Sequence, residues 1–570
     1  MRVKLVAING RYTHSSLALF HVRNELAGHC PDILTEILQL TIRDPYYEVL
    51  LRLTRDEPDA LFFSAYVWNS DRVEELIRDL HTLHPSCLLV VGGPQAEVVG
   101  RNLGQGICTV VNGAVEGLAE GFYRDLRQGE LGPHYGRSFF HLAGKRKKFV
   151  SPYREEDFAT HLANRNIYYE SSRGCPFSCT YCLSSAESGI VRKELEQVGR
   201  ELDQIMAHSP RVLRFVDRTF NDIPERALAI WQLLLGYDSS CLFHFEIAPE
   251  RFNEEMFHFL ATVPPGRFQF EIGIQSTHEP TLDAINRRID PQVAHQTLSQ
   301  LATINTVHLH ADLILGLPYE TEESYLKSFS DLFAMGPHYI QMGLLKMLPD
   351  TPLSNDSDRF DYRFCSRPPY AVLANNWLSA PRMQYLYWFS ECVEKFYNNR
   401  YFPSVWRYLR RRGEDVSEFF RQLLTVAEGQ QLFQLAVTQE FLCRILTDMV
   451  RKRADSLVME QLLAYDWLRC GHRTLPHCLE PHWQERARSL KDRLHAELPL
   501  ESPGLYGRSE RNLFLKRSVF AEFSADCLLE LGHQGVAAQG ENGCLVFFQE
   551  REKSPMGCNR VAFLSHPPPA

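Results

Sequence analysis

The chain has 570 residues, of which 44% are hydrophobic and 23% are charged, and this composition excludes wholesale disorder. A chain of this length exceeds what one hydrophobic core supports, so we expect two to four domains. The formal net charge of −9 gives no electrostatic case for a general nucleic-acid binder, and no apolar stretch approaches the roughly 18 residues that a membrane span requires.

The first 130 residues alternate short apolar strands with helical segments. The expected strands are 3–8, 33–38, 60–64, 87–91 and 108–111. Continuous apolar strands between helices predict a Rossmann-like, doubly wound parallel sheet over residues 1–130, whose ligands would bind at the carboxyl ends of the strands. Residues 131–165 contain a basic run at 145–148 and are expected to form a linker, because a solvated run is more common than a binding patch.

Strands and helices alternate again over residues 166–365. The expected strands are 167–172, 212–216, 242–247, 268–274, 307–315 and 338–346. Six such units predict a partial (β/α)6 barrel, in which the chemistry takes place at the carboxyl ends of the strands.

Three cysteines follow the first strand of this predicted barrel. Cys175, Cys179 and Cys182 have the spacing Cys-x3-Cys-x2-Cys. Thiolates suit iron–sulfur clusters, and three ligands on one loop leave one iron of a [4Fe–4S] cluster open. A zinc site would normally add a fourth Cys or His, which residues 183–200 do not contain. The Gly, Pro and Ser around the cysteines favour an irregular loop over a packed helix.

Acidic and amide side chains lie on or after three other strands of the barrel. They are Asp217, Glu246, Glu271 and Gln275. The period of two places Glu271 and Gln275 on one face of a strand, and a carboxylate there needs a ligand or a protein partner. Arg287 or Arg288 could pair with the glutamates instead, and Asp217 could cap the next helix.

The sequence pattern changes after residue 365. Residues 366–570 are expected to form a mainly α-helical domain, with helices at 383–397, 416–427, 430–453 and 482–498. Short strands with a turn at 540–543 are expected within 505–550, and the tail at 566–570 is expected to be disordered. The arginine-rich stretch 407–413 is read as a solvated helix end in preference to a contact for an anionic substrate or RNA.

The cysteine motif resembles that of the radical S-adenosylmethionine (SAM) superfamily, with Tyr181 in the aromatic position before the last cysteine. The resemblance implies a [4Fe–4S] cluster on the three cysteines and SAM on the open iron, which one electron would cleave to a 5′-deoxyadenosyl radical. It also implies an adenine-packing turn in the Ile-Leu-Gly-Leu-Pro sequence that contains Gly316. The SAM-binding residues that the resemblance implies are Tyr181, Asp217, Glu246, Glu271, Gln275 and Gly316.

The turns after the expected N-terminal strands resemble those of cobalamin-binding Rossmann-like domains in radical SAM proteins. The cobalamin-binding residues that this resemblance implies are His14, Ser64, Gly92, Gly93, Gly113 and Glu116. Three positions depart from the family pattern, because Tyr12 and Leu17 replace an Asp and a Gly, and Gln95 stands where His is frequent. His14 therefore has two open interpretations, as a ligand of cobalt or as a histidine bonded to nearby backbone. The alternative for the whole domain is a relic sheet that binds nothing.

The combined resemblance implies a cobalamin-dependent radical SAM enzyme, with a C-terminal third similar to the uncharacterised extension of one subset of this family. The main hypothesis is a class B methyltransferase that acts on an unactivated carbon through methylcobalamin. One alternative is a radical SAM enzyme that uses cobalamin for rearrangement, cyclisation or methylthiolation. Another is a protein that is not an enzyme and that binds a corrinoid as a sensor or scaffold. The expected partners are an unknown substrate and an electron donor such as flavodoxin or ferredoxin. The fifteen cysteines, and a first segment that reads as a strand, favour the cytoplasm.

Overall fold

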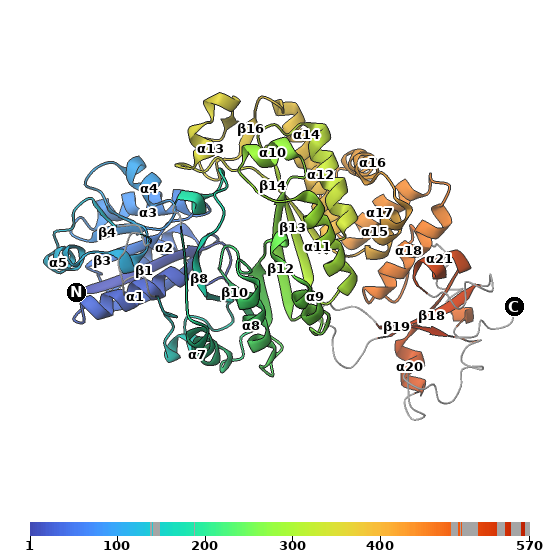
Figure 1. The fold of residues 1–570 in the computed structure, drawn as a ribbon, viewed down its shortest axis with the longest axis horizontal. Coiled ribbons are helices and arrows are strands. Elements are labelled where there is room, and N and C mark those ends of the chain that lie inside the picture. The colour runs from blue at the N-terminus through green and yellow to red at the C-terminus, as the bar shows by residue number, and fades with distance from the viewer. Residues whose placement is uncertain are drawn as a thin grey trace. The chain divides into compact units, whose positions relative to one another are not determined.

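Figure 1 shows the fold of the computed structural model. The structure describes residues 1–136, 140, 149–186, 189–479, 488–490, 492, 511–532, 542–548 and 560–564. The basic run at 145–148, the tail at 566–570, most of the helix expected at 482–498 and the start of the turn expected at 540–543 lie outside these residues. The chain forms two compact units, which are residues 1–328 with 343–384 and residues 329–342 with 385–570.

The first unit begins with a parallel sheet of six strands in the order β2-β1-β3-β4-β5-β6. The strands are β1 (Arg2–Asn9), β2 (Leu34–Thr41), β3 (Ala60–Ser64), β4 (Leu88–Gly92), β5 (Thr109–Asn112) and β6 (His134–Gly136). The helices are α1 (Leu17–His29), α2 (Tyr46–Thr54), α3 (Ser70–Leu83), α4 (Ala96–Leu103) and α5 (Glu120–Gln128). Apolar residues of α2, α3 and α4 pack with the sheet in one hydrophobic core, while α1 contacts β1, β2 and α5. The Rossmann-like parallel sheet is thus confirmed.

Strand β6 lies inside the segment that was expected to be a linker. It pairs with β5 through His134, Tyr135 and Gly136, and the Tyr135 hydroxyl donates a hydrogen bond of 2.8 Å to Asp125. A strand of three residues without an apolar run gives no periodic signal, so the sequence pattern does not reveal it.

A second sheet has the order β14-β13-β12-β11-β10-β7, and its strands from β7 to β13 are parallel. The strands are β7 (Ile167–Tyr169), β10 (Val212–Phe215), β11 (Leu242–Glu246), β12 (Phe268–Gln275), β13 (His308–Leu315) and β14 (Tyr339–Leu344). The helices between them are α7 (Leu195–Met206), α8 (Pro224–Leu235), α9 (Glu254–Ala261), α10 (Glu279–Ala284), α11 (Pro291–Ile304) and α12 (Glu322–Met335). The predicted partial barrel is therefore confirmed.

Side chains of this second sheet alternate between two environments. In β12 every second residue is fully buried, starting from Phe268, and the residues between them are Gln269, Glu271, Gly273 and Gln275. The buried set packs around Trp231 of α8, whose ring lies 5.2 Å from that of Phe270. The polar set therefore faces the interior of the barrel.

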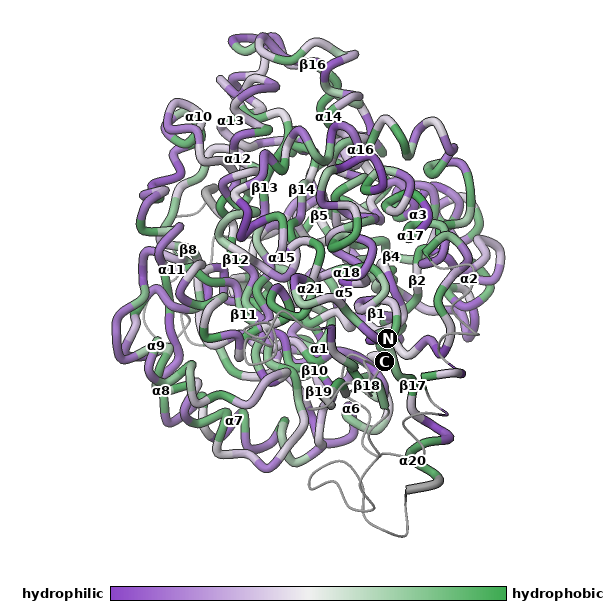
Figure 2. Tube along the Cα trace, turned by 90° about the vertical axis from the view of Figure 1, so that its right-hand side faces the viewer, coloured by the Kyte–Doolittle hydropathy of each residue, from purple (hydrophilic) through white to green (hydrophobic). Residues whose placement is uncertain are grey.

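The remaining elements are mostly helical, as expected. They include α13 (Pro352–Asn355), β15 (Arg363–Phe364), β16 (Val372–Ala374), α14 (Ala380–Val393), α15 (Pro403–Arg412), α16 (Val416–Gly429), α17 (Gln439–Val450), α18 (Ser456–Arg469), α20 (Arg511–Arg517) and α21 (Ala525–Glu530). Strands β17 (Val519–Phe523), β18 (Gly543–Phe548) and β19 (Arg560–Leu564) form an antiparallel sheet. In Figure 2 the colour changes between purple and green along surface helices such as α7 and α8, as expected of helices with one buried face.

Two expectations for the second unit can be compared with the structure. The helix expected at 430–453 begins only at Gln439, because the Thr438 side chain caps it by accepting a hydrogen bond from the amide of Phe441. In the arginine-rich stretch, Arg410 donates to the Phe333 carbonyl, which gives that arginine a structural role. Among the described residues, no helix is both long enough and apolar enough to cross a membrane.

Candidate functional site

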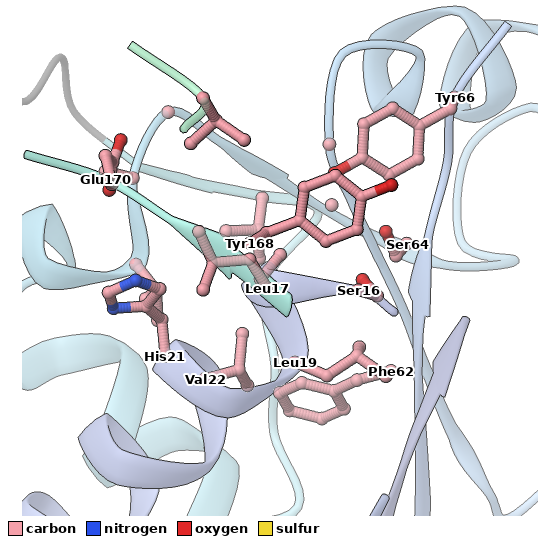
Figure 3. A pocket seen from close by; sticks show the side chains of 18 of the residues that line it. Ser16, Leu17, Leu19, His21, Val22, Phe62, Ser64, Tyr66, Tyr168 and Glu170 are labelled. Carbon is pink, nitrogen blue, oxygen red and sulfur yellow. The ribbon is translucent and has the colours of Figure 1, made fainter. Parts of the chain in front are cut away.

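A cavity of about 830 Å³ lies in the first unit, between the carboxyl ends of the first sheet and the start of the second. One wall comes from the turns after β1, β3, β4 and β5 and from α1, and the other comes from β7 and the residues that follow it (Figure 3). The six residues predicted to bind cobalamin all line this cavity, namely His14, Ser64, Gly92, Gly93, Gly113 and Glu116. The structure thus brings together four turns that are up to about 100 residues apart in the sequence.

Small residues keep the first wall open. Gly93 has a φ of 98°, and a Cβ atom there would lie 2.7 Å from the Ala65 carbonyl oxygen. Ser16 and Ser64 place buried hydroxyls beside the cavity. The Ser64 hydroxyl interacts with that of Tyr66, whereas the Ser16 hydroxyl has no hydrogen-bond partner among the described residues. A buried hydroxyl without a partner on an apolar, glycine-lined wall suits a bulky ligand that carries polar groups.

His14 is held by a tyrosine from the other wall. Its Nδ1 atom lies 2.6 Å from the Tyr168 hydroxyl, and the two rings stack. Burial, with Arg214 and Arg11 nearby, lowers the pKa of His14, so its imidazole is neutral at neutral pH. Tyr168 thus orients the His14 ring, and the assignment of His14 to cobalt stays a prediction.

Glu116 belongs to a buried ionic network on the cavity wall. Arg173 lies 3.2 Å from Glu116 and 2.7 Å from Glu170, and His21 lies 3.3 Å from Glu116. Burial alone would raise the pKa of Glu116, but the Arg173 guanidinium outweighs it and the pKa is lowered. Burial lowers the pKa of His21, so Arg173 is the cation that balances Glu116. Because Arg173 stands two residues before Cys175, the network joins the first sheet to the cysteine loop.

The three cysteines lie on a loop that leaves strand β8 (Ser172–Cys175), which pairs with β9 (Gly189–Arg192) in an antiparallel hairpin. Gly174 has a φ of 106° and passes so close to the Gly189 carbonyl that no side chain fits. The loop is fixed by hydrogen bonds from the Thr180 amide to the Ile285 carbonyl, at 3.0 Å, and from the Leu353 amide to the Thr180 carbonyl, at 2.9 Å. The cysteine loop is therefore held by residues from later parts of the barrel.

One of the three thiols lies beside a basic side chain. Burial raises the pKa of Cys179, and the Arg287 guanidinium beside it offsets part of that rise. Arg287 also stacks over Phe177 and donates to the Gly273 carbonyl, at 2.6 Å. Within the described residues, no three His, Cys, Asp or Glu side chains converge on one metal ion. Cluster thiolates bind different irons and need not converge on one point.

Asp217 already has three protein donors. Its carboxylate accepts hydrogen bonds from the Ser171 amide and from the hydroxyls of Ser171 and Ser172, at 2.6 to 3.0 Å. Burial raises the pKa of Asp217 although these donors oppose the rise. Helix α8 begins after Ile223 without a side-chain cap, so the capping alternative for Asp217 is wrong. Its role toward SAM stays a prediction.

Glu246 and Glu271 are register neighbours on β11 and β12, but their environments differ. Glu246 lines the cavity, and burial raises its pKa to about 7. Glu271 accepts from His244, at 2.9 Å, and lies 3.9 Å from Arg214, and the hydrogen bond with His244 is the main reason why its pKa is lowered. The partners of Glu271 are thus His244 and Arg214 and not the arginines expected from the sequence.

The other predicted SAM residues lie at strand ends and in the cysteine loop. Gln275 ends β12 with a φ of 72°, and its buried Oε1 atom has no hydrogen-bond partner among the described residues. Gly316 follows β13 with a φ of 96°. Tyr181 lies against Cys179, and burial raises the pKa of its hydroxyl. Gln275 therefore keeps a polar atom that a ligand could use, whereas the Tyr181 hydroxyl interacts with Cys179.

Sequence reasoning missed several residues of this site, namely His21, Tyr66, Tyr168, Glu170, Arg173 and Arg218. Glu170 and Arg173 stand shortly before Cys175 in the sequence, so their position was a usable signal. Tyr168 meets His14 across 154 positions of sequence, and no local pattern announces such a pairing.

Two family models match the chain. One is described as the radical SAM superfamily and matches residues 169–332, and the other is described as a protein of unknown function (DUF4080) and matches residues 358–535. The chain therefore contains a radical SAM domain, followed by a region that matches the DUF4080 description.

Two curated relatives are similar to part of the chain. The cobalamin-dependent radical SAM methyltransferase TokK of Streptomyces tokunonensis is 27% identical over 332 residues, which is 52% of this chain and 48% of that protein. The 2-(S-pantetheinyl)-carbapenam-3-carboxylate methyltransferase of Streptantibioticus cattleyicolor is 24% identical over 424 residues, which is 64% of this chain and 61% of that protein. The chain thus spans about half to three fifths of the length of these relatives.

Two solved structures share the fold. The cobalamin-dependent SAM radical enzyme OxsB, with aqua-cobalamin and SAM bound, has a TM-score of 0.56 at 13% identity, over 90% of this chain and 83% of that chain. The radical SAM methyltransferase TsrM from Kitasatospora setae, with cobalamin and a [4Fe–4S] cluster bound, has a TM-score of 0.50 at 15% identity, over 64% and 78%.

Proposed function

We propose that this protein is a cobalamin-dependent radical SAM enzyme that transfers a methyl group to an unactivated carbon. The observation that carries the proposal is the shared cavity. Turns at the carboxyl ends of the first sheet form one wall, and Arg173 and Gly174, which directly precede the first cysteine, contribute to the other. A corrinoid on the first wall would therefore lie next to a cluster on the cysteine loop.

The residues fit three cofactors. Cys175, Cys179 and Cys182 would hold a [4Fe–4S] cluster, while the glycine-lined turns and the hydroxyls of Ser16 and Ser64 would hold cobalamin. When bound, the cluster with SAM supplies a radical that abstracts hydrogen, and the corrinoid supplies a methyl group on cobalt. The similarity to TokK, OxsB and TsrM, which are described as cobalamin-dependent radical SAM enzymes or as radical SAM methyltransferases, supports this proposal.

The chain's own side chains would prepare this site in three ways. Arg287 stabilises negative charge on Cys179. Apolar side chains such as Leu19, Val22 and Phe62 keep water from the cavity (Figure 3). Glu246 places a carboxyl group that titrates near neutral pH at the cavity wall, where it would respond to a bound cation.

The proposal also includes an electron donor such as flavodoxin or ferredoxin, and a cytoplasmic setting. Reduction of a cluster requires a one-electron donor, and an oxygen-sensitive cluster requires a reducing compartment.

Anaerobic reconstitution tests the proposal. The protein is loaded with iron, sulfide and hydroxocobalamin, and then given SAM and a strong reductant. We expect about four irons and about one corrinoid per chain, with 5′-deoxyadenosine and S-adenosylhomocysteine as products. Cys179→Ala should form no 5′-deoxyadenosine, and Cys87→Ala is the matched control, because Cys87 lies outside the triad and does not line the cavity. A protein that takes up iron but no corrinoid would contradict the cobalamin assignment, and 5′-deoxyadenosine without S-adenosylhomocysteine would contradict methyl transfer.

A further inference from the structure

The segment that follows the barrel belongs to the first unit and contacts both halves of the candidate site. Residues 358–378, here called the strap, open the region that matches the DUF4080 description. They include strands β15 and β16, which pair as a short hairpin. The strap reaches the turn after β13 at one place and the turn after β4 at another.

The first contact is with Gly316, the residue predicted to pack against adenine. The Gly316 carbonyl accepts hydrogen bonds from the Tyr362 hydroxyl, at 2.9 Å, and from the Asn375 amide group, at 3.0 Å. All three groups are buried. A Cβ atom at Gly316 would lie 3.2 Å from the Met383 side chain, just beyond the strap. The conformation of this turn is therefore set by residues outside the radical SAM match.

The second contact is with Gln95, which follows the glycine pair of the cavity wall. The Tyr370 hydroxyl donates a hydrogen bond of 3.0 Å to the Gln95 side chain, and both residues are at least 96% buried. Arg367 adds ion pairs with Asp71, at 3.1 Å, and with Glu74, at 3.6 Å. Gln95 stands where the related family frequently has histidine, and the structure shows that it serves here as an acceptor for the strap.

The strap is fixed between its two contacts. The Met347 amide donates to the Tyr370 carbonyl, and the Val372 amide donates to the Leu345 carbonyl, at 2.8 and 3.0 Å. Asn375 accepts hydrogen bonds from the amides of Trp377 and Leu378 while it donates to Gly316. Tyr370 has a φ of 59°, an unfavourable conformation for a tyrosine that the surrounding hydrogen bonds maintain.

We propose that the strap is a positioning element that sets the turn at Gly316 relative to the turn at Gln95, and thereby sets SAM relative to the corrinoid. This inference rests on the proposed function. It gives the first part of the DUF4080 domain a role in the cofactor site, through Tyr362 and Asn375 on one side and Tyr370 on the other. These residues act through backbone and through Gln95, so they are positioning residues.

Binding measurements on the reconstituted protein test this role. Tyr362→Phe and Asn375→Ala each remove one donor to Gly316, and Tyr370→Phe removes the donor to Gln95. SAM affinity is measured by equilibrium dialysis, and corrinoid affinity by visible-absorption titration with hydroxocobalamin. Arg363→Ala is the matched control, because this exposed strap residue bonds only Asp361 among the contacts that the structure describes.

The expected result is a split between the two affinities. Tyr362→Phe and Asn375→Ala should weaken SAM binding about fivefold each and leave corrinoid binding within about twofold, since one hydrogen bond contributes on the order of that factor. Tyr370→Phe should weaken corrinoid binding about fivefold and leave SAM binding unchanged. In combination with Gln95→Leu it should cause no further loss, because both changes remove the same hydrogen bond.

The melting temperature and the iron content of each variant separate positioning from unfolding. A variant that melts like the parent and holds its cluster but shows no selective loss would overturn the proposal, and so would equal losses of both ligands in all three variants. If the parent protein itself binds neither SAM nor corrinoid, the proposed function is wrong. This outcome is distinct from a parent that binds both ligands and variants that show no selective loss, which would refute only the positioning role of the strap.

Discussion

The two sheets of the first unit present opposite chemistry to the candidate site. The first sheet ends in glycines and serines that leave a largely apolar cavity, with Gly92, Gly93 and Ser64 on its wall. The second sheet lines its interior with ionisable side chains such as His244, Glu246 and Glu271. The difference shows that one wall suits a bulky ligand held by shape, whereas the other suits a charged ligand held by ionic contacts.

The largest effect on activity should come from a substitution in the cysteine loop, and it should not change ligand binding by the first sheet. Cys179→Ala removes the buried thiol that we propose as a cluster ligand, and we expect the formation of 5′-deoxyadenosine to fall by more than about 100-fold while corrinoid binding stays within about twofold. Product analysis and visible-absorption titration measure the two quantities. Loss of corrinoid binding in this variant would show that the two walls are not independent.

A glycine of the first wall should be sensitive to size as well as conformation. Gly93→Ala places a methyl group 2.7 Å from the Ala65 carbonyl oxygen, and we expect it to lower the free energy of unfolding by about 3 kcal/mol and to abolish corrinoid binding. Gly129 also has a positive φ, of 75°, but has open space around it. Gly129→Ala should therefore cost only about 1 kcal/mol in urea unfolding. Equal losses in the two variants would contradict the crowding that we describe at Gly93.

The neighbouring glutamates of the barrel should respond to pH in opposite directions. The pKa of Glu246 is raised to about 7, so the folded state holds a proton between pH 4.5 and 7 that the unfolded state has lost, and stability falls as pH rises through this window. Glu246→Gln should therefore stabilise the ligand-free protein at pH 8, by on the order of 2 kcal/mol, and have little effect at pH 4.5.

Glu271→Gln is the contrasting variant. Because the pKa of Glu271 is lowered, its carboxylate stabilises the folded protein above pH 4.5, and this stabilisation is lost as the pH falls through the pKa of the folded state. The substitution should lower the melting temperature at pH 8. Melting curves of both variants from pH 4.5 to 8 check the pair, and shifts of the same sign at pH 8 would refute the contrast.

The smallest effect should come from the ionic network that joins the two regions. Glu116→Gln keeps the shape of the side chain but removes its charge from Arg173, which still pairs with Glu170. We expect a loss of about 1 kcal/mol in the free energy of unfolding. Glu120→Gln is the control, because the Glu120 side chain is mostly exposed. It should change the free energy of unfolding by less than about 0.5 kcal/mol. If Glu116→Gln lowers the free energy of unfolding no more than the control does, the network does not stabilise the contact between the first sheet and the cysteine loop.

The sequence predicted the elements that depend on continuous apolar runs and missed those that depend on distant partners. The strands of the first sheet were recognisable because buried parallel strands are apolar along their length. Those of the second sheet, such as β12, were recognisable because apolar residues alternate with polar ones. Strand β6 was missed because His134, Tyr135 and Gly136 pair only through their backbone. The start of α17 was missed because the side chain of Thr438, and not a change of periodicity, begins this helix.

The residues of the candidate site also fall into a group that the sequence predicted and a group that it missed. Motif spacing located the cysteines and the glycine turns, since their chemistry depends on residue type. The partners of these residues could not be foreseen, because they come from other strands. Tyr168 reaches His14 across 154 positions, and Glu271 meets His244 across 27. Only the folded sheets bring such pairs to hydrogen-bond distance.

The central claim is that one cavity places a corrinoid next to the cluster on the cysteine loop. Electron paramagnetic resonance of the protein loaded with both cofactors and reduced by one electron at each centre tests it most directly. We predict that the cobalt and cluster signals broaden through magnetic interaction, and that each sharpens to its isolated form when the other cofactor is omitted. Two unperturbed signals in the fully loaded protein would contradict the shared cavity.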